Sequence, residues 1–281
     1  MKGPAAWSRA IGVAASLCST ALATFAGPVT LAPALSGQYA AGSGVDAEFM
    51  KVADSWHQST VLWNEARKSY GSGVAIGSLR WGDGLWGLAD WHTVNQSPEL
   101  AQSRWQGRVG SISFGDANYN SEWGASWGKV ALAPLFVGAE ASQDNWTSHF
   151  FGYLRISQAG AYNFSVLHDD GFFFRLGGAG GQALELSHDY LNARERLGFA
   201  TDLMLDVGLY AFELGGYDRI GSGVVDLAWA RDGSAWALVP TEHLVARADV
   251  QRVPEPGSLP LALAGLCLTG ALSLRRRFAS R

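Results

Sequence analysis

The sequence is poor in cysteine, methionine and charged side chains. Its 281 residues include two cysteines and three methionines, and charged residues make up 16%. Cys18 and Cys267 lie in the two apolar terminal stretches, so the body of the chain has no thiol for a disulfide or a cysteine-ligated metal. The six histidines show no H-E-x-x-H or similar zinc spacing.

Basic residues are also scarce in the body of the chain. Residues 1–26 and 257–281 hold six of the 21 basic residues and none of the 25 acidic ones. The remainder therefore carries an excess of about ten negative charges, which argues against nucleic acid as a partner because such partners need basic patches. The balance suits a secreted protein or one that takes up cations.

The N-terminus has the pattern of a secretory signal peptide. Lys2 and Arg9 precede the apolar run 11–23, and small residues follow. We expect cleavage after Ala23 or Ala26, which makes residues 1–26 the signal peptide.

The C-terminus, residues 249–281, resembles the PEP-CTERM sorting signal. The apolar run 259–274 has 16 residues, about 24 Å of helix and so just short of a hydrocarbon core of about 30 Å. The resemblance implies cleavage by an exosortase and release to the surface or exopolysaccharide matrix of a Gram-negative cell, after transient anchoring by this helix. The alternative is a plain membrane anchor. The residues that carry the resemblance are Pro254, Glu255, Pro256, Arg275, Arg276 and Arg277.

The central stretch 149–178 reads as strand, turn, strand, acidic turn and strand. Tyr162, Phe164 and Val166 alternate with small or polar residues, which is typical of a half-buried strand. Asp169-Asp170-Gly171 then stands between two apolar strands. Two adjacent carboxylates in such a place indicate a turn, a site for a hard cation, or both.

This stretch is similar to the protective-antigen-type (PA-fourteen) β-sandwich module of bacterial surface proteins, glycosidase accessory domains and fungal adhesins. The similarity covers roughly residues 105–248 and implies an antiparallel β-sandwich or barrel. The matching motifs, in order, are Gly152–Leu154, Ala159–Phe164, Asp169–Gly171 and Phe172–Gly178.

The resemblance also implies a ligand site. In the lectin branch of this family a cis peptide joins the two acidic residues, here Asp169 and Asp170, and both bind one Ca²⁺ that coordinates sugar hydroxyls. Gly171 belongs to the same motif. The branch completes the site with an Asn in a later loop, where this chain has Asp218. The alternative is that the D-D-G motif only shapes a turn.

Residues 27–104 match no family that we recognise. Helical spacing of apolar residues predicts one amphipathic helix over 46–70. Apolar and polar residues alternate on both sides of Asp83-Gly84, which predicts a hairpin over 73–94 that carries Trp81, Trp86 and Trp91. These tryptophans either cover a core or stack on sugars. The region is either a separate domain ending near residues 95–104 or a part of the next one.

The other expected elements belong to the β module. We predict a loop over residues 116–127. Further strands are predicted over 109–114, 131–137, 196–207, 209–214 and 224–229.

These patterns give three functional hypotheses. The first is a non-enzymatic, exported surface or matrix protein that binds carbohydrate, with Ca²⁺ as the cofactor. The second is a structural matrix or protein-interaction component without glycan binding. The third, glycan hydrolysis, needs two carboxylates about 5–10 Å apart in a cleft. The G-x-S-x-G match at residues 124–128 lacks the strand and helix around it that a catalytic serine needs.

Overall fold

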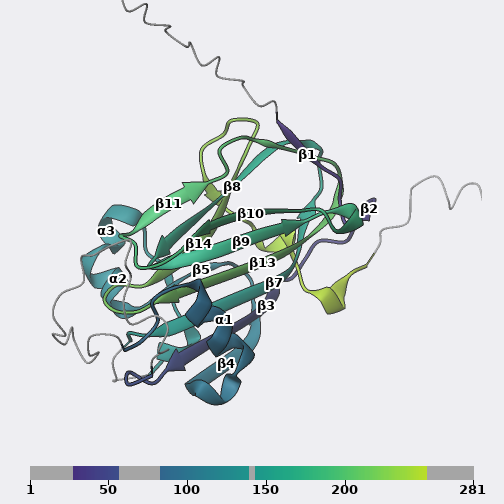
Figure 1. Cartoon of the computed structure of the whole chain (residues 1–281). Helices are drawn as coiled ribbons and strands as arrows, with labels where there is room; N and C mark the ends of the chain where they lie inside the picture. Colours follow the sequence, from purple (N-terminus) through teal and green to yellow (C-terminus); the bar gives the residue numbers. More distant parts are fainter. Residues whose placement is uncertain (1–27, 57–82, 139–142, 252–281) are drawn as a thin grey trace, which may run out of the picture.

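Two β-sheets pack face to face in the computed structural model, which describes residues 28–56, 83–138 and 143–251 (Figure 1). The first sheet has the order β1 (Val29–Leu31), β12 (Leu203–Leu205), β8 (Gly160–Asp169), β14 (Val224–Arg231), β5 (Ser113–Gly115) and β6 (Ala131–Leu132). Two further strands pair with it: β11 (Glu195–Gly198) with β8, and β15 (Ala237–Leu238) with β14.

The second sheet contains the longest strands of the described chain. Its order is β10 (Ala183–His188), β9 (Gly171–Gly177), β13 (Gly208–Asp218), β7 (Trp146–Ile156), β3 (Val45–Val52) and β4 (Ala101–Val109). Strand β16 (Leu244–Val245) pairs with β7, and β2 (Leu35–Ser36) pairs with β13.

Short helices connect these strands. The α-helices are α1 (Leu88–Gln96), α2 (Ala117–Glu122) and α3 (Gly124–Trp127), and the 3₁₀ turns span Pro98–Leu100, Pro134–Phe136, Ala179–Gly181, Thr241–His243 and Arg247–Asp249.

The main core lies between the two sheets and is rich in aromatic rings. Phe164 of β8 lies 5.8 Å from Phe174 of β9, and Phe114 of β5 stacks at 6.0 Å on Phe150 of β7. Each pair joins one sheet to the other, and all four rings are buried. Burial of such alternating apolar residues is the main force that holds a sandwich together.

The mainly-β sandwich expected from sequence is confirmed. Strands β8, β13 and β14 cover the segments where apolar and polar residues alternate most clearly, and β9 covers the apolar run that follows the acidic turn. Pairing is antiparallel through the middle of both sheets. It is parallel at β1–β12 and β5–β6, so the prediction of antiparallel pairing is wrong at these places.

The predicted helix over 46–70 is wrong in its first part, because β3 occupies Val45–Val52. Val45, Ala47 and Phe49 are buried, whereas Asp46 and Glu48 between them are only half-buried. This alternation with a period of two is typical of a strand. In the sequence it was concealed because Phe49 and later apolar residues also recur at helical spacing. Residues 57–70 lie outside the described chain. Strand β3 pairs with both β7 and β4, so this part of the chain belongs to the second sheet.

The predicted hairpin is likewise wrong over its described part, because α1 forms there. Trp91 and Val94 are three residues apart on one helical face and pack on Phe173 and Tyr217, on the outer side of the second sheet. The Trp91 indole N–H donates to the Ser148 carbonyl at 3.0 Å. Trp91 is therefore a core residue, and Trp86 is buried as well; residues 73–82, with Trp81, lie outside the described chain.

Several other predicted elements also differ from the structure. The strand predicted over 109–114 contains the last residue of β4, a short connection and the start of β5. The strand predicted over 131–137 is limited to the two residues of β6, and a 3₁₀ turn begins at Pro134. The loop predicted over 116–127 contains α2 and α3. The strand predicted over 196–207 is divided into β11 and β12. The signal peptide (1–26) and the sorting helix (259–274) lie outside the described residues.

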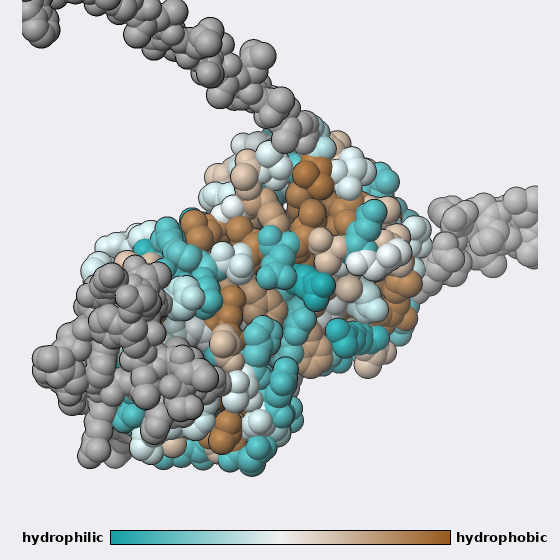
Figure 2. All heavy atoms as spheres, viewed as in Figure 1, coloured by the Kyte–Doolittle hydropathy of each residue, from teal (hydrophilic) through white to brown (hydrophobic). Residues whose placement is uncertain are grey.

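The outer face of the second sheet is of mixed polarity. Figure 2 shows hydrophilic residues crossing this face and separating the hydrophobic ones into small groups. Strand β10 at the edge alternates exposed with half-buried residues, and its Leu184 and Leu186 pack against the main core.

Candidate functional site

Asp169, Asp170 and Asp218 meet where strands of both sheets end. Asp169 is the last residue of β8, Asp218 is the last of β13, and Asp170 lies where the chain crosses from β8 to β9. The Asp170 N–H donates to the Tyr217 carbonyl at 2.8 Å, which holds the acidic pair against β13. The Asp169–Asp170 peptide bond is cis. Strand pairing thus places Asp218 beside a pair from which it is distant in sequence.

The three carboxylates are close enough to share one ion. One oxygen from each lies within 4.8 Å of the other two. Asp218 is fully buried, and neither of its carboxylate oxygens has a hydrogen-bond partner. The Asp170 Oδ2 accepts a hydrogen bond from the Arg219 N–H at 2.9 Å. A buried ionised carboxylate without partners is costly, so Asp218 is stable only if it gains a proton or a cation.

Burial and mutual repulsion raise the pKa values of these groups. Burial raises the pKa of Asp169 to about 6, against the opposing effect of the Arg194 guanidinium. Burial, followed by the negative charges of Asp170 and other nearby carboxylates, raises the pKa of Asp218 well above its usual range. Asp116, which the sequence did not single out, has its pKa raised by burial to about 7. Without a cation, these groups therefore keep their protons to a higher pH than exposed carboxyl groups do.

Arg194 compensates part of the negative charge. Its Nη2 donates to Asp169 Oδ2 at 2.7 Å and to the Ser222 carbonyl at 2.8 Å. Its guanidinium lies 4.8 Å from the ring of Trp123 and 5.0 Å from that of Tyr119. One guanidinium does not balance the carboxylates gathered here, so the site is anionic at a pH at which they have lost their protons.

Asp116 positions the loops around the cluster. Its Oδ1 accepts from the Tyr119 N–H at 2.7 Å and caps α2, and its Oδ2 accepts from the Gly223 N–H at 2.7 Å. A Cβ on Gly223 would lie 2.6 Å from the Cβ of Asp218, so this close approach requires glycine. Asp116 thus ties α2 to the loop that follows Asp218.

Gly171 allows the strands to approach at the same place. A Cβ there would lie 2.3 Å from the Tyr217 hydroxyl oxygen and 2.7 Å from the His188 carbonyl oxygen. The third residue of the D-D-G motif therefore provides space for the packing of β9 against β13.

A hollow of about 340 Å³ opens beside the cluster. Trp123 and Trp127 line it, each 44% exposed, together with Asp169, Arg194 and Ser222. Neither tryptophan was expected from the sequence to be a site residue. The one signal that could have indicated them is the concentration of tryptophan and asparagine between residues 116 and 127.

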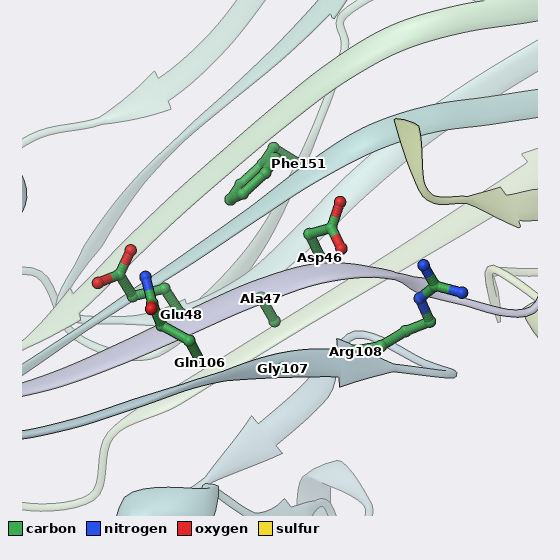
Figure 3. Close-up of a pocket in the computed structure, with 7 residues that line it drawn as sticks. All are labelled: Asp46, Ala47, Glu48, Gln106, Gly107, Arg108 and Phe151. Carbon is green, nitrogen blue, oxygen red and sulfur yellow. The ribbon is translucent and has the colours of Figure 1, made fainter. Parts of the chain in front are cut away.

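A second hollow, of about 420 Å³, lies over β3 and β4. Figure 3 shows Glu48 and Gln106 at one end, Arg108 at the other and Phe151 beside Asp46. Glu48 is paired with Arg104, and Arg108 with Asp249. Because these charges are paired within the protein, this hollow is the weaker candidate for a ligand site.

The residues that predict export, Pro254 to Pro256 and Arg275 to Arg277, lie outside the described chain. A model of the PEP-CTERM protein-sorting motif matches residues 252–277. The chain carries a PEP-CTERM sorting signal. This signal marks an exported, cell-surface protein and implies processing by an exosortase.

Among solved structures, this chain is similar to PA14 domains. It is 16% identical to the PA14 domain of the MpAFP antifreeze protein, over 75% of this chain and 95% of that one, with a TM-score of 0.43. It is 19% identical to a PA14 sugar-binding domain from an RTX adhesin, over 73% of this chain and 99% of that one, with a TM-score of 0.43. It is 13% identical to the epithelial adhesin 9 A domain from Candida glabrata, in complex with Galb1-4GlcNAc, over 82% of this chain and 99% of that one, with a TM-score of 0.45. At such scores the likeness says nothing about ligands, and the sandwich is established by the strand pairing itself.

No curated protein matches the chain. Within residues 28–56, 83–138 and 143–251, no helix is long and apolar enough to cross a membrane.

The raised pKa values predict an unusual pH dependence of stability. The pKa values of Asp90, Asp116 and Asp169 are about 6, 7 and 6, and that of Asp218 is also raised, so between pH 4 and 7 the folded protein binds more protons at these groups than the unfolded chain does. Without metal, the free energy of unfolding should therefore fall as pH rises through this range. His168, whose pKa burial lowers to about 4, gives the opposite slope but is a single group.

Urea unfolding in EDTA at pH 4.5, 6 and 8 measures this slope. Asp218→Asn removes one of the titrating groups and should make the fall shallower. A free energy of unfolding that rises from pH 4.5 to 8 would contradict the prediction.

Proposed function

We propose that this protein is a non-enzymatic surface or matrix component that binds carbohydrate through Ca²⁺ held by Asp169, Asp170 and Asp218. The observation that carries the proposal is the Asp218 carboxylate, which is fully buried, has no hydrogen-bond partner at either oxygen and lies within 4.8 Å of the other two carboxylates. The exported chain would be anchored by residues 259–274 in the inner membrane of a Gram-negative cell until cleavage near Pro254–Pro256.

The donor set favours Ca²⁺ among biological cations. Ca²⁺ takes six to eight oxygen ligands, and the cluster offers carboxylate oxygens only. Carboxylates that hold protons in the absence of metal release them to a divalent cation. When bound, the ion would supply coordination positions for the hydroxyls of a sugar.

The hollow beside Asp169 supports a carbohydrate as the ligand. Trp123 and Trp127 offer flat apolar surfaces that are partly exposed, and sugar rings stack well on such surfaces. Arg194 and Ser222 add polar groups to the same wall. Apolar surface and hydrogen-bonding groups thus meet next to the ion site.

One observation favours the alternative of a structural component without glycan binding. Asp169 is already paired with Arg194, and Asp170 already accepts a hydrogen bond from Arg219. These bonds hold the acidic turn in place without an ion. Asp218 is the member of the cluster that they do not satisfy.

Calcium-dependent retention on immobilised polysaccharides tests the proposal. In 2 mM Ca²⁺, the full-length protein should be retained by at least one polysaccharide of an immobilised panel, and EDTA should release it. Trp123→Ala or Trp127→Ala should weaken binding at least tenfold, equivalent to about 1.4 kcal/mol, without changing the melting shift that Ca²⁺ produces.

Trp236→Ala is the matched control. Trp236 is also 44% exposed, but it follows the far end of β14, the strand whose first residue pairs with Asp169. Its removal should leave retention unchanged. Retention on no glycan, or equal losses from all three tryptophan variants, would favour the structural alternative.

A further inference from the structure

Two histidines and a glutamate converge next to the carboxylate cluster. His168 immediately precedes Asp169 on β8, and Glu195 of β11 is its direct partner in the first sheet. His188 is the last residue of β10 in the second sheet, opposite Phe172. The three side chains therefore bridge the sheets, although they are spread over 28 positions of the sequence.

Their ligand atoms form a small triangle. The His188 Nδ1 lies 3.4 Å from the His168 Nε2 and 2.9 Å from the Glu195 Oε1, and the His168 Nε2 lies 4.0 Å from the same oxygen. Zn²⁺ binds imidazole nitrogen and carboxylate oxygen at about 2.0–2.2 Å, which separates tetrahedral ligands by about 3.3–3.6 Å. Shifts of a few tenths of an ångström would bring all three distances to that spacing.

The hydrogen bond behind His168 fixes its tautomer. The His168 Nδ1 lies 2.9 Å from the Asp170 carbonyl oxygen, which only accepts, so Nδ1 carries the proton and donates it. The Nε2 lone pair then points into the triangle. Metal-binding histidines typically donate their other N–H to a backbone carbonyl in this way.

A hydrogen-bonded triad explains the triangle less well than a metal does. The His188 Nδ1 carries at most one proton, which it can donate to the Glu195 Oε1 at 2.9 Å or to the His168 Nε2 at 3.4 Å. One of these two acceptor atoms therefore receives no hydrogen bond from His188. A metal ion accepts lone pairs from all three. The side chains of His188 and Glu195 are 34% and 43% exposed, which leaves a path for the ion and room for a water ligand.

We propose that His168, His188 and Glu195 bind a divalent transition-metal ion of the Zn²⁺ class. Imidazole ligands suit such ions, whereas the all-oxygen cluster of Asp169, Asp170 and Asp218 suits a hard cation. The two sites are adjacent but differ in chemistry. Because His168 also holds the Asp170 carbonyl, the metal fixes the main chain that carries the carboxylates.

Co²⁺ is a suitable probe because its visible absorption reports four-coordinate nitrogen and oxygen ligation. The full-length protein should develop this absorption at one equivalent of Co²⁺ and lose it when Zn²⁺ is added. His188→Gln and Glu195→Gln should each weaken Zn²⁺ binding at least tenfold. Thermal melts of both variants check that they are folded.

Two controls separate this site from other histidines and from the carboxylates. His149→Gln removes a similar histidine–glutamate pair, in which the His149 Nε2 lies 2.8 Å from the Glu213 Oε1 with no third ligand in the described chain, and should leave Co²⁺ absorption unchanged. Asp218→Asn should also leave it unchanged. Absence of the absorption in the wild type, or equal loss from His149→Gln and His188→Gln, would overturn the proposal.

Discussion

Asp218→Asn should stabilise the metal-free protein at pH 8 and abolish its response to Ca²⁺. The Asp218 carboxylate is buried without a hydrogen-bond partner beside two other carboxylates. An asparagine of the same shape is uncharged, and its amide is able to donate to a neighbouring carboxylate. Removing an unsatisfied buried charge should raise the free energy of unfolding by about 1–3 kcal/mol in EDTA.

The same substitution should prevent stabilisation by Ca²⁺. A ligand at a hundredfold excess over its Kd stabilises the folded state by about 2.7 kcal/mol. For a folded body of this size that is a rise in Tm of about 5–10 °C. The wild type should show the rise and the variant should not. Melting curves at pH 8, with EDTA and then with 2 mM Ca²⁺, measure both effects on one sample.

Asp226→Asn is the matched control. Asp226 is also a buried aspartate, but its Oδ1 accepts from Arg196 at 2.7 Å and its Oδ2 interacts with the Ser113 hydroxyl at 3.3 Å. Its replacement should lower the free energy of unfolding in EDTA and leave the Ca²⁺ shift intact. If Asp218→Asn behaved in the same way, the Asp218 carboxylate would not be a metal ligand.

The sequence predicted the centre of the sandwich well because local and global preferences agree there. Strands β8 and β13 alternate apolar with small or polar residues over much of their length, β9 is a short apolar run, and all three begin with glycine. The N-terminal region was mispredicted in β3, where the apolar residues fit both the period of a strand and that of a helix. In β3, Val45, Ala47 and Phe49 point to the main core while Met50 and Val52 pack under α1, so the strand is buried on both faces near its end and imitates a helical stripe.

From residue patterns alone, the candidate sites were predictable only where their residues are neighbours in sequence; Asp218, distant in sequence, was expected at the site only through the family resemblance. The Asp169–Asp170 pair stood out as two carboxylates between apolar strands. Its other neighbours, Asp116 and Arg194, come from different loops and are brought together by strand order. The His168–His188–Glu195 triangle has no sequence spacing of its own, because strand register alone sets which residues of β8, β10 and β11 face one another.

Phe150→Ala should cause a large loss of stability. Phe150 is fully buried between the sheets, with its ring 5.5 Å from Phe49 and 6.0 Å from Phe114. Truncating a phenylalanine at such a position leaves a cavity that neighbouring strands cannot fill, at a cost of about 3–5 kcal/mol. The free energy of unfolding from urea titration measures this cost.

Phe151→Ala provides the comparison because adjacent residues of a strand point to opposite faces. Phe151 is half-buried on the outer face of the second sheet, where it lines the hollow over β3 and β4 (Figure 3). Its loss should cost about 1 kcal/mol, within the usual range for a partly exposed site. A cost equal to that of Phe150→Ala would mean that the outer face of β7 is covered as fully as the inner one. The expected difference of several fold instead assigns the stability of this sheet to the aromatic layer that joins it to the first.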